Sequence, residues 1–474
     1  MRRIVFYEPA TKHPHVFKQF HLPRLGGVLL GTLLKKAGYD VSVYVEDLRP
    51  PRLEDLLGAD LVGISTITST APRAYRMADY LRSKGVNVLL GGPHVTFMPD
   101  EALQHADYVF RGEAERSIVP LVKALEAGSG LERVPGLSFR RGGETFHNPP
   151  AEPVWDLDEL PDPDWSLLHG SFRIAWSNKI VPIQTSRGCP FDCSFCSVTK
   201  MFGRKVRYRS VGRVLDELSR MDLRRRHVFF YDDHFSANRG RLRELMEGIL
   251  ARGLRFQWSA QVRADLADDE DLVELMRRAG CQTVYIGMES VNPETLKAYN
   301  KHQTVSDIER SIRVLHRHRI RIHGMFVLGA DTDTVETVRA TCRFAKKNRI
   351  ETIQFLILTP LPGTPFFAEM EREGRLGIRD WSYYDAHHVV FEPKRMSPYE
   401  LQREIVRALR EFYSLPRILD DVLRLRLWEA LVKIYARRIE LRWERLSGWF
   451  LDSLKGGLSS VRALIESGRA PAAT

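Results

Sequence analysis

Apolar residues in the first 120 positions alternate between short β-rich runs and stretches with helical spacing. The β-rich runs predict strands at Arg3–Tyr7, Asp40–Val45, Leu61–Ser65, Val86–Leu90 and Tyr108–Arg111. The stretches between them predict helices at Leu25–Ala37, Ala71–Lys84 and Ser117–Ala127. This alternation predicts an α/β fold that begins with a doubly wound, Rossmann-like domain, an open parallel sheet with helices on both faces.

Ligands of doubly wound sheets bind at the carboxyl ends of the strands, where glycine lets a ligand approach the backbone closely. The candidate residues at these ends are Gly26, Gly27, Ser65, Thr66, Gly91, Gly92, His94, Gly112 and Glu113. A glycine after a strand usually only makes a turn. Four such ends in one domain nevertheless favour a bound ligand, so we expect a cofactor at this edge.

A proline-rich, acidic segment follows, with prolines at 149, 150, 153, 161 and 163. Because proline lacks a backbone donor and disfavours helix in the residue before it, we expect an extended connector. The predicted organisation is a first domain at 1–147, a connector at 148–175, a second domain at 176–395 and a tail at 396–474.

The second domain repeats the alternation of strands and helices. Strands are predicted at Ile180–Thr185, His227–Tyr231, Phe256–Val262, Thr283–Met288, Arg321–Leu328 and Thr352–Leu358. Intervening helices are predicted at Val211–Met221, Arg239–Arg252 and Asp268–Ala279. Six such units predict a partial or full TIM-type βα-barrel with its chemistry at the carboxyl ends of the strands. The pattern alone also allows a second doubly wound sheet.

The tail has helical spacing throughout, with an apolar stripe and a basic remainder. Residues 401–474 hold 14 Lys and Arg against 9 Asp and Glu. Its large aromatic residues include Trp428, Trp443, Trp449 and Phe450. We expect this α-helical tail either to pack against the protein, as a cap on the barrel or a dimer interface, or to lie on an anionic membrane surface.

Composition narrows the class of protein. A chain of 474 residues with 43% apolar and 28% charged residues is typical of two or three globular domains. Five cysteines and no visible secretory signal argue against a secreted disulfide scaffold, and the apolar stretch Leu25–Leu34 is too short to span a bilayer. We therefore expect a cytoplasmic protein. The formal charge of +11 suggests an anionic partner, but without a zinc-finger or RNA-binding signature we expect no nucleic acid.

Three of the five cysteines, Cys189, Cys193 and Cys196, lie in one loop after the first predicted barrel strand. Thiolates at this spacing can converge on one metal centre. A structural zinc site needs four closed ligands, and no fourth is evident nearby. Three thiolates on a four-iron cluster leave one iron open to a substrate. We expect the other two, Cys281 and Cys342, to be ordinary buried thiols.

The CxxxCxxC spacing on this loop, with Phe195 before the third cysteine, resembles the radical S-adenosylmethionine (SAM) enzymes. The resemblance implies that Cys189, Cys193 and Cys196 hold three irons of a [4Fe-4S] cluster whose fourth iron binds SAM. It also implies that a one-electron reductant, such as flavodoxin or ferredoxin, drives cleavage of SAM to a 5′-deoxyadenosyl radical. The protein then positions and shields the cofactor.

Polar residues on the other predicted barrel strands are candidates for contact with SAM. Together with Phe195 they are Asp232, Asp233, Ser259, Gln261, Arg263, Glu289 and Gly324. The resemblance places the Asp232–Asp233 pair beside the SAM amino group. Because an unpaired charge at the end of a buried strand is costly, we expect Asp232, Arg263 and Glu289 to meet ligand or each other, with a purely structural ion pair as the alternative. We expect the segment 331–333 to cap a helix.

A sheet domain before such a barrel resembles the cobalamin (B12)-binding domain of a large radical SAM subclass. The segments Leu89–Thr96 and Tyr108–Glu115 carry this resemblance. The DxHxxG signature, through which some B12 proteins ligate cobalt, is absent. We therefore expect His94 to contact the corrinoid from its loop or tail side and not to ligate cobalt. Some relatives keep this domain without binding cobalamin.

The resemblance implies a cobalamin-dependent methyltransferase acting on an unactivated carbon of a small molecule or lipid. The alternative is radical C–C bond formation or oxidative cyclisation of a lipid or tetrapyrrole-like substrate without methyl transfer. A non-catalytic iron–sulfur and B12 sensor fits less well with the polar residues at the barrel mouth. Peripheral membrane contact, if present, is expected through the C-terminal helices.

Overall fold

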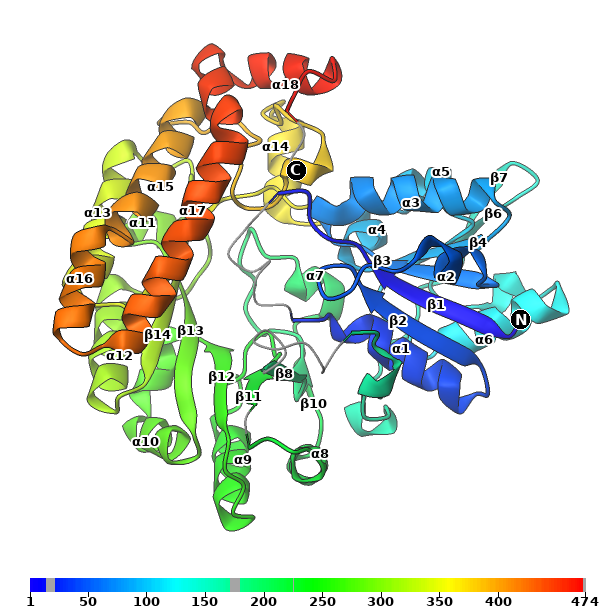
Figure 1. Ribbon diagram of the computed structural model, residues 1–474, viewed down its shortest axis with the longest axis horizontal. Coiled ribbons are helices and arrows are strands. Elements are labelled where there is room, and N and C mark those ends of the chain that lie inside the picture. Colours follow the sequence, from blue (N-terminus) through cyan, green and yellow to red (C-terminus); the bar gives the residue numbers. More distant parts are fainter. Residues whose placement is uncertain (14–21, 171–179, 225, 472–474) are drawn as a thin grey trace.

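The computed structural model describes residues 1–13, 22–170, 180–224 and 226–471. The boundary predicted between connector and second domain, at 175/176, lies outside the described residues. Two large sheets lie side by side, and the C-terminal helices run along the outer flank of the second (Figure 1).

The first domain is built on a seven-stranded sheet with the strand order β2-β1-β3-β4-β5-β6-β7. Its parallel strands are β1 (Arg3–Glu8), β2 (Asp40–Val45), β3 (Leu61–Ser65), β4 (Asn87–Gly91) and β5 (Tyr108–Phe110). The helices are α1 (Leu25–Lys36), α2 (Leu53–Leu57), α3 (Ala71–Ser83), α4 (Pro93–Phe97), α5 (Pro99–His105) and α6 (Ile118–Ala127).

Side chains of β1 alternate between two apolar clusters. Ile4 and Phe6 join the cluster that contains residues of α1 and α6, whereas Val5 and Tyr7 join the one that contains residues of α3 and α5. Helices therefore cover both faces of the sheet, which confirms the doubly wound prediction.

Two strands at the edge of this sheet were not expected from the sequence. The strands β6 (Leu137–Arg141) and β7 (Glu144–His147) form an antiparallel hairpin that extends the sheet from β5. β7 is exposed throughout, so it lacks the buried alternation that identifies a strand. The available signal was the Gly142-Gly143 turn between two short runs.

The proline-rich connector packs back onto the first domain. Val154, Leu157, Leu167 and Leu168 are buried, and Leu168 forms a parallel bridge with Val43 of β2. The connector thus covers part of the first domain before the chain enters the second.

The second domain is a six-stranded open barrel in which each neighbouring pair of strands is parallel, in the order β15-β14-β13-β12-β11-β8. Its strands are β8 (Ile180–Ile183), β11 (His227–Phe230), β12 (Gln257–Val262), β13 (Cys281–Glu289), β14 (Arg321–Leu328) and β15 (Thr352–Ile357). The accompanying helices are α8 (Val211–Arg220), α9 (Arg239–Ala251), α10 (Glu270–Arg278), α11 (Pro293–Ala298), α12 (Val305–Arg317) and α13 (Val335–Lys347). This arrangement confirms the partial barrel and not a second doubly wound sheet.

The C-terminal region is helical, as predicted. It follows α14 (Pro365–Arg372) of the second domain and consists of α15 (Pro398–Phe412), α16 (Leu415–Leu423), α17 (Leu427–Ser453) and α18 (Leu458–Glu466). α15 packs on α13 and β15, and α17 packs on α15 and α16. Trp443 and Phe450 of α17 are buried, so this part of the tail packs against the protein. Across the described ranges, no helix is both long and apolar enough to cross a membrane.

Candidate functional site

The three clustered cysteines lie on an excursion between β9 (Ser186–Arg187) and β10 (Arg207–Tyr208), two short strands that pair antiparallel and close its base. All three thiols are partly buried. Burial raises the pKa of each thiol, and the charge of Cys193 adds to that effect on Cys189 and on Cys196, whose pKa reaches about 12. The three sulfur atoms therefore share one electrostatic environment.

The remaining cysteines lie elsewhere. Cys281 in β13 and Cys342 in α13 are at most 1% exposed, which confirms the prediction of buried thiols. The excursion therefore offers three thiol ligands from one short loop, a donor set that fits an iron–sulfur cluster with one open iron.

The segment after α11 holds the cysteine loop in place. The Ser194 amide donates to the Tyr299 carbonyl at 3.2 Å, and the Asn300 side chain donates to the Asp192 carbonyl at 3.1 Å. The Phe195 ring meets the Tyr299 ring edge to face at 4.9 Å between centroids. Phe195 therefore anchors the loop to the barrel, whatever else it contacts.

The two neighbouring aspartates after β11 play different parts. Asp232 is 1% exposed and accepts hydrogen bonds from the Thr185 amide and hydroxyl at 2.7 and 2.6 Å and from the Ser186 hydroxyl at 2.7 Å. It ties the base of the cysteine loop to β11. Asp233 accepts from the Gly188 amide at 3.1 Å, and burial raises its pKa to about 6. Asp233 is the better placed of the two to meet a ligand beside the thiols.

Two predicted charged residues pair with groups that the sequence did not single out. Glu289 forms a buried ion pair with Lys301 at 2.6 Å. Arg263 lies 3.6 Å from the centre of the Phe191 ring and donates to the Lys301 carbonyl. These charges act on the Cys193 thiol, where Lys301 and Arg263 oppose the rise in pKa that burial causes. The structure thus brings Arg263 and Glu289 to the cysteine loop, with Glu289 in a structural ion pair, the alternative given for these charged residues.

Two predicted contacts are not brought to the mouth of the barrel. Ser259 is hydrogen-bonded to His227, the first residue of β11, at 2.8 Å, so it faces the amino end of the strands. A side chain at Gly324 would touch Phe326 and Ile350 at 3.2 and 3.4 Å, so this glycine faces packed apolar groups. Gln261 lies one residue before the end of β12, partly buried, and remains a candidate at the mouth.

The predicted helix cap at 331–333 was wrong in position. Asp333 accepts from the Gly329 and Ala330 amides at 3.0 and 3.1 Å, so it caps the turn after β14. The N-cap of α13 is Thr334.

At the carboxyl edge of the first sheet, three of the predicted glycines border open space. Nothing lies within 4 Å of a Cβ built on Gly26, Gly91 or Gly112. Gly92 has φ +105°, and a Cβ there would lie 2.3 Å from the Thr66 carbonyl oxygen. The Thr66 hydroxyl donates to the Gly91 carbonyl at 2.9 Å. Gly26, Gly91 and Gly112 thus leave open positions along this edge, which fits the close approach of a large flat ligand such as a corrin ring.

Two other predictions at this edge need correction. Gly26 and Gly27 lie in the first turn of α1 and not at the end of β1, and a Cβ built on Gly27 would make an ordinary contact with Phe6 at 3.6 Å. Ser65 does end β3, as predicted, and its hydroxyl accepts from Arg24 at 3.4 Å.

His94 does not face the glycine edge. It is 1% exposed, its Nε2 lies 3.3 Å from Glu101, and its ring meets Trp381 edge to face at 5.1 Å. The Trp381 indole N–H also donates to Glu101, at 2.9 Å. His94 therefore helps to join the first domain to the region after the barrel, and the predicted contact with a corrinoid is not supported by its position.

Glu113 lies in a buried ion-pair network between the domains, in place of the predicted cofactor contact. Its carboxylate accepts from Arg207 of β10 at 2.9 Å and lies 3.4 Å from Arg187 of β9, which pairs with Glu115 at 2.7 Å. These side chains are all less than 10% exposed. The network fixes the base of the cysteine loop against the carboxyl edge of the first sheet.

The strands of the first sheet point toward the barrel (Figure 1). Burial raises the pKa of Tyr231, which directly follows β11, to about 12. The charges of Arg24 and Glu8, at the carboxyl end of β1, also act on this hydroxyl. Arg24 and Glu8 pair at 3.1 Å. The cysteine loop and the glycine edge therefore belong to one site between the domains.

Comparison with known proteins gives two family matches. Residues 183–345 match the radical SAM superfamily, and residues 19–122 match the B12 binding domain. Bacteriochlorophyllide d C-12(1)-methyltransferase of Chlorobaculum tepidum is 33% identical over 82% of this chain and 82% of its own. The anaerobic magnesium-protoporphyrin IX monomethyl ester cyclase of Cereibacter sphaeroides is 32% identical over 80% of this chain and 65% of its own.

Solved structures share the fold. The cobalamin-dependent SAM radical enzyme OxsB, with aqua-cobalamin and SAM bound, superposes with a TM-score of 0.71 at 17% identity, over 99% of this chain and 75% of its own.

Proposed function

Because the chain belongs to the family of B12-binding radical SAM enzymes, we propose that it methylates an unactivated carbon atom in a cobalamin-dependent reaction. Its cofactors are a [4Fe-4S] cluster, SAM and cobalamin. Bound together, they supply a radical able to take hydrogen from carbon and a methyl group to replace it. The protein's own residues hold these groups in one place and exclude water.

The observation that carries the proposal is that the Glu113 network joins the base of the cysteine loop to the carboxyl edge of the first sheet. The thiols of Cys189, Cys193 and Cys196 would hold the cluster, with Asp233 and the Glu289–Lys301 pair beside them. Gly91 and Gly112 would leave room for a corrin at the glycine edge. Methyl transfer between two cofactors needs both within reach of one substrate carbon, because orientation supplies much of the rate enhancement.

The second candidate is radical cyclisation without methyl transfer. It is favoured by the 32% identity to a magnesium-protoporphyrin cyclase, against 33% to a bacteriochlorophyllide methyltransferase. For either reaction we propose a small molecule or lipid as substrate, with a tetrapyrrole-like compound as the first class to test. We also propose a one-electron reductant, such as flavodoxin or ferredoxin, as the electron source.

The test is anoxic reconstitution with iron, sulfide, cobalamin, dithionite and methyl-labelled SAM, followed by mass spectrometry. We expect wild-type protein to release 5′-deoxyadenosine and to pass the label to a tetrapyrrole or lipid substrate. The Cys189→Ala/Cys193→Ala/Cys196→Ala variant should do neither. The Cys342→Ala variant, which changes a buried thiol outside the loop, is the matched control and should retain both.

Two results would overturn the proposal in different ways. A substrate converted with 5′-deoxyadenosine release but without the label favours cyclisation. No 5′-deoxyadenosine above the level of the triple variant contradicts the radical chemistry in this chain.

A further inference from the structure

The exposed apolar side chains are concentrated on one helical hairpin. Of the fourteen large apolar residues that are exposed in the described part of the chain, ten lie on α16, α17 and the turn between them. They are Leu415, Leu419, Val422, Leu423, Leu425, Leu427, Trp428, Leu431, Ile434 and Leu441. A concentration of this kind on an otherwise polar surface marks an interaction site.

The charged residues on the exposed face of α17 are all positive as far as Arg445. Between Leu427 and Arg445, the exposed positions hold only apolar residues and arginine. The three arginines, Arg438, Arg442 and Arg445, form no ion pair with any described residue. The face is therefore a band of leucine, isoleucine and tryptophan that continues into a band of unneutralised cations.

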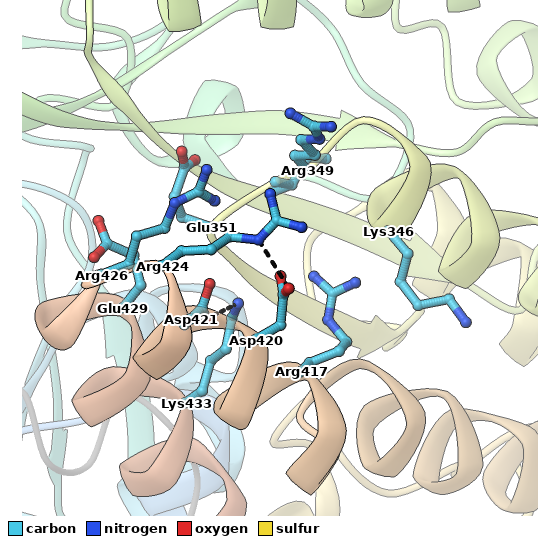
Figure 2. A pocket seen from close by; sticks show the side chains of 11 residues that line it. Lys346, Arg349, Glu351, Arg417, Asp420, Asp421, Arg424, Arg426, Glu429 and Lys433 are labelled. Carbon is cyan, nitrogen blue, oxygen red and sulfur yellow. Dashed lines mark hydrogen bonds and ion pairs between the residues drawn. The ribbon is translucent and has the colours of Figure 1, made fainter.

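Leucine and arginine alternate along the turn of the hairpin. Leu423, Leu425 and Leu427 are 82%, 83% and 59% exposed. Arg424 and Arg426, between them, line a cavity of about 190 Å³ beneath the turn (Figure 2). Leucine side chains thus point outward at the tip, with guanidinium groups directly behind them.

The cavity keeps unpaired positive charge. Three of its cations are paired: Arg424 with Asp420 at 2.8 Å, Lys433 with buried Asp421 (Figure 2), and Lys346 with Glu411. Arg349, Arg417 and Arg426 also line it and have no ion-pair partner within the described ranges. The buried Nε of Arg417 has no hydrogen-bond partner. These groups can take an anionic oxygen ligand such as a phosphate ester.

We propose that the outer face of the α16–α17 hairpin docks the enzyme onto an anionic phospholipid surface. The exposed leucines and Trp428 enter the boundary between headgroups and acyl chains, while the arginines bind lipid phosphates. Charge favours this occupant over a second copy of the chain. In a two-fold dimer whose axis passes through the arginine band, the band would face itself, with no acidic residue opposite to neutralise it.

Not all of the large aromatic residues of the tail belong to the proposed docking face. Trp443 and Phe450 are buried, at 8% and 0% exposure, so the docking face consists of α16, the turn and the exposed side of α17 from Leu427 to Arg445. Glu429, near the turn, pairs at 3.1 Å with Arg321, the first residue of β14. The turn therefore lies at the amino end of the barrel strands, away from the cysteine loop.

The test measures binding of the full-length, cofactor-loaded protein to phosphatidylcholine vesicles with and without phosphatidylglycerol, by flotation. We expect binding that needs phosphatidylglycerol and weakens as salt rises. Leu423→Ser/Leu425→Ser and Arg426→Glu/Arg442→Glu should each weaken it at least tenfold. Matched controls of equal chemistry elsewhere, Leu53→Ser/Phe146→Ser and Arg76→Glu/Arg278→Glu, should bind as the wild type does.

The remaining outcomes overturn the proposal. These are absence of binding, binding that does not depend on phosphatidylglycerol, and equal losses in the hairpin and control variants. A dimer seen by sedimentation velocity and abolished by Leu423→Ser/Leu425→Ser would assign the face to a second copy instead. Because all altered side chains are exposed, unchanged melting temperatures verify folding, and the readout does not depend on turnover.

Discussion

His323, in the middle of the barrel sheet, is a buried imidazole whose environment makes protonation costly. It is 7% exposed, and its Nδ1 lies 2.8 Å from the Thr352 hydroxyl. Burial lowers its pKa to about 4, below the value near 6.5 of an unfolded histidine. Between these values the unfolded chain takes up a proton that the folded protein does not. Folding is therefore more stable above pH 6.5 and loses this contribution as pH falls toward 4.

We predict that wild-type protein loses about 1–3 kcal/mol more stability than His323→Asn between pH 6.5 and 4. Urea unfolding monitored by fluorescence at several pH values measures this difference. The pH dependence, and not the offset between the two proteins, is the diagnostic quantity. Parallel curves across this range would contradict the prediction.

Substitution of two adjacent glycines, Gly91 and Gly92, by alanine should affect the protein in two different ways. Gly92 has φ +105° and no room for a Cβ beside Thr66, so Gly92→Ala should lower the free energy of unfolding by about 1–3 kcal/mol. Gly91→Ala adds its methyl group to open space, so it should leave stability unchanged within about 0.5 kcal/mol.

Cobalamin binding tests the same pair of variants independently. Because the added methyl group of Gly91→Ala points into the proposed corrin space, we expect weaker cobalamin binding by a correctly folded protein. Absorbance titration with hydroxocobalamin measures it. Unchanged affinity in Gly91→Ala would place the corrinoid away from this edge.

The residues of the site were predictable to the extent that their chemistry is local in the sequence. The cysteine spacing identified the ligand loop, and Asp233, Arg263 and Glu289 lie beside it. Lys301, Arg187 and Arg207 were missed, because only the fold pairs them with acids. Arg187 meets Glu115 across more than seventy residues, a distance at which no sequence period operates.

At the scale of elements, the spacing of apolar residues predicted the bounds of most strands to within a few residues. β1 was expected at Arg3–Tyr7 and extends to Glu8, and β14 was placed without error. The β6–β7 hairpin was missed because its outer strand is exposed on both sides and carries no buried alternation. In helix α17 the apolar spacing is continuous, but large apolar residues near its start, such as Trp428, are exposed, whereas Phe450 near its end is buried. The spacing alone could not separate these two parts of the helix.

This division of α17 predicts opposite responses to alanine. Phe450 is fully buried and stacks on Tyr383 at 5.5 Å between ring centres, so Phe450→Ala should destabilise the protein by about 3–5 kcal/mol. Leu441 is 44% exposed on the same helix, and Leu441→Ala should change stability by less than about 0.5 kcal/mol. Thermal and urea unfolding compare the two. Similar values would mean that the helix does not pack as described.

At the scale of the whole molecule, the Glu113 network joins the domains. Removing its carboxylate leaves the guanidinium groups of Arg187 and Arg207 buried and less compensated, so Glu113→Ala should destabilise the protein by about 3–5 kcal/mol. It should also reduce iron content after reconstitution, because the base of the cysteine loop loses its support. Glu159→Ala, which breaks the exposed pair with Arg116, is the control and should cost at most about 1 kcal/mol.

Iron content separates a positioning role from general stability. We expect Glu113→Ala to hold less iron even at a temperature at which circular dichroism shows it fully folded. Full iron loading under those conditions would limit the network to a structural role.

The opposed sheet edges have an electrical consequence. In a strand–helix unit, each helix begins near the carboxyl end of the strand before it, so helices of both domains direct their amino ends toward the space between the sheets. The peptide dipoles of a helix sum to about half a positive charge at that end. Two sets of such ends, one from each domain, converge on the same volume. These helix ends therefore offset part of the cost that burial imposes on a negative charge there, such as the charge of a thiolate or of the Asp233 carboxylate.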